Sequence, residues 1–170
     1  MMMRAQAMFF VAFVIACAMC LASLASAHGQ TAGGPANATL SKAHASALKH
    51  AQALSTYLSR RATAEKDIVL RHSDAIGTAL QEAAQVSTSL ATEVRADKAK
   101  EHVESMREHQ ADAADKHKKL TDELTLVPLD AEAIRSIARE IVDEVRSAQR
   151  ENISAAAIER GVQKRRVPVE

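Results

Sequence analysis

From Ala99 to Val127, mostly small and apolar residues recur alternately four and three positions apart, which predicts a helix over residues 97–126. This spacing forms a continuous stripe, called the seam below, on one side of a helix that packs on other helices with a left-handed supercoil. The helix is expected to end before Pro128, because proline disfavours helix at the residue preceding it. The seam positions are Ala99, Val103, Met106, Gln110, Ala113, His117, Leu120, Leu124 and Val127.

The same rhythm predicts three further helices, over residues 39–61, 63–94 and 130–160. Asp130 suits an N-cap position at the start of the last of these. Their seam positions are Leu40, His44, Ala47, Ala51, Leu54 and Leu58 in the first helix; Val69, His72, Ile76, Ala79, Ala83, Val86 and Leu90 in the second; and Ile134, Ala138, Ile141, Val145, Ala148, Asn152, Ala155 and Val162 in the last.

At the break near residue 62 the first two seams run in phase, so the spacing alone does not require a turn there. One long helix over residues 40–94 is the alternative. A turn is preferred, because so long a helix standing alone would leave its apolar stripe poorly covered. The break near residue 95 has stronger support: the rhythm loses phase there, and Asp97 can cap a new helix.

These elements predict an all-α protein, an up-and-down antiparallel four-helix bundle with Ala-rich heptad seams. Alanine lets helices approach closely but buries little area, so stability is expected to depend partly on a protein partner or on self-association. Gly77, inside the second helix, costs about 1 kcal/mol relative to alanine.

Residues 1–27 are predicted to be a cleaved secretory signal. Arg4 precedes an apolar run, FFVAFVIACAMCLA, and Ala25-Ser26-Ala27 offers a cleavage site before His28. A membrane anchor, or a lipoprotein cleavage box ending at Cys17, are the alternatives. Residues 28–38 are expected to form a flexible leader, and the basic residues 161–170 a disordered tail.

Composition narrows the possible functions. Aromatic residues make up 2% of the chain, and Tyr57 is the only one after Phe13, which argues against a base-stacking nucleic-acid surface. The net charge of +1 implies no strongly charged partner. Both cysteines, Cys17 and Cys20, precede the cleavage site, so no disulfide is expected afterwards. We expect a protein of the bacterial periplasm or a secreted one, with membrane contact only through an uncleaved signal or the basic tail.

Several polar residues interrupt the seams, and counting from each turn predicts which of them meet. The count places His50 opposite His72, His72 near His117, and His117 near Glu140. Three imidazoles and a carboxylate suit a divalent ion such as Zn, Cu or Ni. The alternative is that these histidines pair with neighbours or face water. A similar count places His44 level with His109 and Gln110; His102 and His109 themselves have charged neighbours, which favours a solvated face.

The sequence contains no Gly-rich phosphate loop, no HExxH pattern and no recognisable nucleophile context, so no enzyme activity is predicted. The primary hypothesis is an exported, non-catalytic bundle that acts through protein–protein contacts or self-association. The alternative hypothesis is a transition-metal-binding bundle, a sensor, buffer or store, that uses inward-facing histidines.

Overall fold

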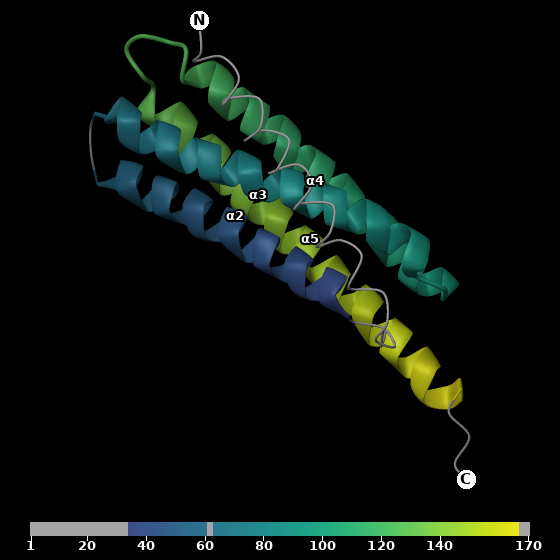
Figure 1. Ribbon diagram of the computed structural model, residues 1–170. Helices are drawn as coiled ribbons and strands as arrows, with labels where there is room; N and C mark the ends of the chain where they lie inside the picture. Colours follow the sequence, from purple (N-terminus) through teal and green to yellow (C-terminus); the bar gives the residue numbers. More distant parts are fainter. Residues whose placement is uncertain (1–33, 61–62, 167–170) are drawn as a thin grey trace, which may run out of the picture. The chain divides into compact units, whose positions relative to one another are not determined.

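The computed structural model describes residues 34–60 and 63–166. These residues form four helices and no strand, which confirms the all-helical prediction (Figure 1). The helices are α2 (Pro35–Ser59), α3 (Lys66–Glu93), α4 (Asp97–Glu123) and α5 (Ala131–Arg166). A break separates α2 from α3, so the single helix over residues 40–94 does not form. The predicted signal, residues 1–27, and the start of the leader lie outside the described residues.

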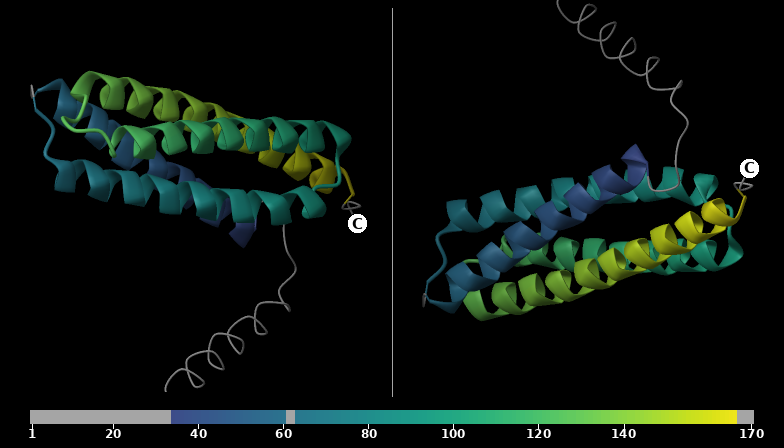
Figure 2. Two further views of the ribbon diagram at one scale, coloured as in Figure 1. Left: turned by 90° about the horizontal axis from the view of Figure 1, so that it is seen from above. Right: turned by 90° about the horizontal axis from the view of Figure 1, so that it is seen from below.

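Each helix of the bundle lies beside two others. α2 contacts α3 and α5, and α4 contacts the same two helices. The connections α2–α3 and α4–α5 lie at one end of the bundle and the α3–α4 connection at the other (Figure 2). None of the described helices has the length and apolar character needed to span a bilayer.

The seams form the core, in which small side chains alternate with larger ones. Leu54, Ile76 and Ile141 belong to a cluster of buried residues that also contains Ala47, Ala51 and Ala138. A second cluster holds Leu40, Val103 and Met106 with Ala83, Ala99 and Ala148. Most seam positions are buried; His72, Val86, His117 and Val162 are partly exposed, and Val127 is 88% exposed.

Val127 is exposed because α4 ends at Glu123, earlier than predicted. The N–H groups of Thr125 and Leu126 donate to the carbonyls three residues before them, which tightens the chain into turns ahead of Pro128. α5 then begins as predicted: a carboxylate oxygen of Asp130 accepts hydrogen bonds from the N–H groups of Glu132 and Ala133, at 2.9 and 3.0 Å. Asp130 is therefore confirmed as a cap.

Other helix ends correct the sequence-based expectations. α2 begins at Pro35, inside the predicted leader, because proline in a first turn lacks only an N–H that has no helical partner there. Asp97 is the first helical residue of α4 and not its cap; Ala96 takes the cap position without a side-chain hydrogen bond. Across the α2–α3 connection, the Tyr57 hydroxyl accepts a hydrogen bond from the N–H of Glu65 at 3.2 Å.

The expectation of a disordered tail from residue 161 is wrong as far as Arg166, where α5 ends. Glu159 is 8% exposed, and its Oε1 accepts hydrogen bonds from the N–H groups of Arg95 and Ala96, at 2.8 and 2.7 Å. Ile158 packs against the second core cluster. These contacts tie the last turns of α5 to the α3–α4 connection, and they explain why the helix continues. The remaining predicted tail residues, 167–170, lie outside the described residues.

Candidate metal centre

Histidines cross-link the bundle. Each of the six in the described part of the chain hydrogen-bonds or pairs with a polar group on another helix. The pairs are His50 with His72, His44 with Gln110, His117 with Ser73, His102 with Glu151, and His109 with Glu144. Imidazole rings thus take interior and interface positions in a core that has few aromatic rings.

Two of these contacts agree with the count from the turns. His50 Nδ1 and His72 Nδ1 lie 3.2 Å apart across α2 and α3, and the ring centroids are 5.4 Å apart. In the core, Gln110 Nε2 lies 2.9 Å from His44 Nε2. His44 is fully buried, and burial lowers the pKa of its imidazole to about 4. Its other ring nitrogen, Nδ1, is buried without a hydrogen-bond partner.

The other predicted ligands have different partners. His117 Nε2 donates to the backbone oxygen of Ser73 at 2.9 Å, one residue along from His72. Glu140 lies 3.7 Å from Lys116 Nζ, one residue along from His117. The heights along the helices are therefore close to those predicted, but a step of one residue turns a side chain by about 100° around the helix. Of the four predicted ligands, the structure brings His50 and His72 into contact.

Gly77 makes room for His117. A Cβ atom at this position would lie 2.7 Å from His117 Cε1, closer than carbon atoms normally approach, and 3.2 Å from Nε2. The glycine therefore allows the imidazole to reach the Ser73 carbonyl, which is the packing reason for a residue that weakens the helix.

Substituting Gly77→Ala is expected to destabilise the protein by about 1 kcal/mol, although alanine is the better helix former, because the imidazole must leave Ser73. In a His117→Ala background the same change should stabilise by about 1 kcal/mol. Urea unfolding of the four proteins in this cycle measures both values. Equal effects of Gly77→Ala in the two backgrounds would show that His117 does not constrain this position.

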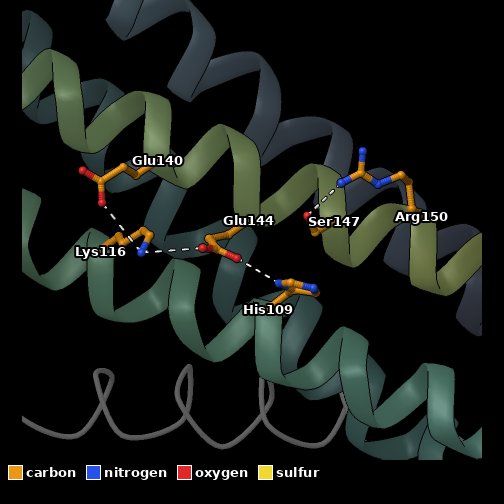
Figure 3. A network of polar contacts seen from close by, with 6 residues as sticks. All are labelled: His109, Lys116, Glu140, Glu144, Ser147 and Arg150. Carbon is orange, nitrogen blue, oxygen red and sulfur yellow. Dashed lines mark hydrogen bonds and ion pairs between the residues drawn. The ribbon is translucent and has the colours of Figure 1, made fainter.

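One group of three potential ligands converges among the described residues. The donor atoms of His109, Asp112 and Glu144 all lie within 4.8 Å of one another. His109 and Asp112 stand three residues apart, which places them on one face of α4. Glu144 reaches them from α5, and its Oε2 lies 2.9 Å from His109 Nδ1 (Figure 3).

A cation already contacts the carboxylate of this group. Lys116 Nζ lies 3.6 Å from Glu144 Oε1 and 3.7 Å from Glu140 Oε2, between the two carboxylates (Figure 3). The side chains of His109 and Glu144 are 32% and 23% exposed, so water reaches them. The other contact drawn in Figure 3, in which Arg150 donates a hydrogen bond to Ser147, lies further along α5 and does not involve this group. Lys116 thus competes with any metal ion for Glu144.

The sequence-based interpretation missed this group because it read the charged neighbours of His102 and His109 as signs of a solvated face. Both imidazoles are partly exposed, and the carboxylates of Glu151 and Glu144 on α5 pair with them. A signal was present, since the count from the Pro128 turn places Glu144 level with Ala113, about one helical turn from His109.

An imidazole nitrogen and two carboxylate oxygens can hold a divalent transition metal, with water in the open positions. Comparisons with protein-family models, curated proteins and solved structures find no match to this chain.

Proposed function

We propose that the protein is a non-catalytic helical bundle that binds a divalent transition metal between α4 and α5, with His109, Asp112 and Glu144 as ligands. The convergence of three donor atoms from two helices within 4.8 Å carries the proposal. Zinc suits this mixture of nitrogen and carboxylate ligands, and copper and nickel are the alternatives. The function is then that of a metal sensor, buffer or store.

An up-and-down antiparallel order of the helices is part of this proposal. His102, His109 and Lys116 of α4 contact Glu151, Glu144 and Glu140 of α5, in that order. The residue numbers of the α5 partners therefore decrease as those of α4 increase, as expected for antiparallel helices. The alternating ends of the three connections in Figure 2 also support this order. It is this order that keeps the ligands of α4 and α5 level with each other.

Export is also proposed, to the bacterial periplasm or to the exterior. The positive start at Arg4, the apolar run after it and the small residues before His28 support a cleaved signal. Cleavage would remove both cysteines, and imidazole and carboxylate groups would then be the metal ligands of the mature chain. N-terminal sequencing of the exported protein tests this; a mature chain that retains Met1 contradicts it.

Zinc titration of the full chain by calorimetry tests the metal site. Glu144→Gln and His109→Gln should each remove about one equivalent of bound zinc, because each deletes a ligand. Lys116→Met should tighten binding about fivefold, since a partly exposed ion pair contributes at most about 1 kcal/mol. His102→Gln, a matched histidine on the same helix, should change nothing. Unchanged zinc stoichiometry in both Glu144→Gln and His109→Gln contradicts the site.

Action through protein–protein contacts or self-association is the second candidate function. Two neighbouring apolar side chains in the α4–α5 connection favour it, because Leu126 is 51% and Val127 88% exposed. A protein partner or a second copy of the chain would cover them. Light scattering should show association of the full chain that Val127→Asp weakens; a monomer at micromolar concentration contradicts self-association.

A further inference from the structure

The histidine pair between α2 and α3 has the spacing of two ligands on one metal ion. His50 Nδ1 and His72 Nδ1 face each other at 3.2 Å, with the ring planes tilted by 54°. Two nitrogens bound to zinc at about 2.0–2.1 Å, in tetrahedral geometry, lie about 3.3 Å apart. The pair therefore fits a zinc ion with little movement of either helix.

We propose that His50 and His72 form a second zinc site, in which the two Nδ1 atoms bind the ion and water completes its coordination. Both side chains are partly exposed, so water and the ion can reach them. The site shares no residue with the group between α4 and α5 and does not depend on it.

The contact between the two rings favours binding. A hydrogen bond between two Nδ1 atoms requires that one of them carries a proton and the other offers a free lone pair. Neutral imidazole is the form that ligates metals. Without metal, one ring donates its Nδ1 proton to the other; on binding, that proton moves through water to Nε2 of the same ring, and the net charge of the pair does not change.

Arg71 is the charged group that opposes a cation here. Its Nε donates to the backbone oxygen of Asp67 at 3.3 Å, one turn earlier on α3, which directs the guanidinium toward the start of the helix. No carboxylate of the described residues joins this pair in a three-ligand group. Imidazole donors without a carboxylate favour Zn, Cu and Ni over Mg, Ca and Mn.

Histidine-ring nitrogen NMR of the full chain, with zinc chloride as the probe, tests the proposal. Zinc should shift the Nδ1 resonances of His50 and His72, and magnesium at the same concentration should leave them unchanged. His102 is the internal control, since it lies outside both sites. Unchanged His50 and His72 resonances at saturating zinc would overturn the proposal. The measurement uses the wild-type protein, so it does not depend on whether a variant folds.

Calorimetry separates the two sites. His50→Gln and His72→Gln should each remove about one zinc equivalent and leave the equivalent bound through Glu144. Circular dichroism checks that these variants keep their helices. If zinc binds only at the His50–His72 pair, His109→Gln should bind as much zinc as the wild type. That result would refute the function proposed for the α4–α5 group and leave the second site supported. If His50→Gln and His72→Gln retain the wild-type stoichiometry, the second site is overturned.

Discussion

Acidification from pH 6.5 to about pH 4 is expected to remove about 3 kcal/mol of stability through His44 alone. The imidazole is fully buried, and burial lowers its pKa from 6.5 to about 4. The unfolded chain therefore takes up a proton at this residue before the folded chain does. The stabilising contribution is complete above pH 6.5 and is lost as the pH falls toward 4.

Urea unfolding across this pH range, followed by far-UV circular dichroism, measures the effect. His44→Gln keeps an amide partner for Gln110 but does not titrate, so its stability should fall less steeply with acid. Identical slopes for wild type and His44→Gln would refute the role assigned to the buried ring.

Substituting Glu159→Ala should lower the free energy of unfolding by about 3 kcal/mol. The carboxylate accepts hydrogen bonds from the N–H groups of Arg95 and Ala96, where α4 begins, and such charge-assisted bonds are stronger than neutral ones. Its negative charge also lies at the positive end of the α4 dipole. Both backbone donors would lose their partner in the alanine variant.

Glu159→Gln retains a neutral acceptor, so its loss should be nearer 1 kcal/mol. The exposed Glu132→Gln is the matched control and should cost less than about 0.5 kcal/mol. Hydrogen exchange provides a second measurement: amides near residue 160 should exchange faster in Glu159→Ala. Unchanged exchange there, with wild-type stability, would mean that the end of α5 does not depend on this contact.

Seam spacing predicts four helices and the contacts nearest to the seams. The pairs His50–His72 and His44–Gln110 lie where counting from the turns places them, because the rise of a helix is constant. Counting fixes height only. His117 lies at the predicted height along the helix, but its imidazole hydrogen-bonds to Ser73 and fills the space above Gly77. This contact depends on how α3 and α4 pack against each other, which counting from a turn does not determine.

Contacts between distant residues explain the other differences. Nothing in the local pattern near Gly161 indicates that Glu159 meets the N–H groups of Arg95 and Ala96, so the pattern predicts too early an end for α5. The α4–α5 group was missed for a related reason. Charged residues next to a histidine in the sequence favour a solvent-exposed helix face. The partner of His109 is instead Glu144 on α5, which the residues around His109 in α4 do not indicate.

The position of the tyrosine determines what optical experiments on this protein can observe. Tyr57 is the only tyrosine, the chain has no tryptophan, and its hydroxyl is bonded across the α2–α3 connection. Intrinsic fluorescence therefore reports on one end of the bundle. Glu159 acts at the α3–α4 connection, at the opposite end (Figure 2). Local fraying there would leave tyrosine emission unchanged, so a melting curve recorded by fluorescence alone would overlook it.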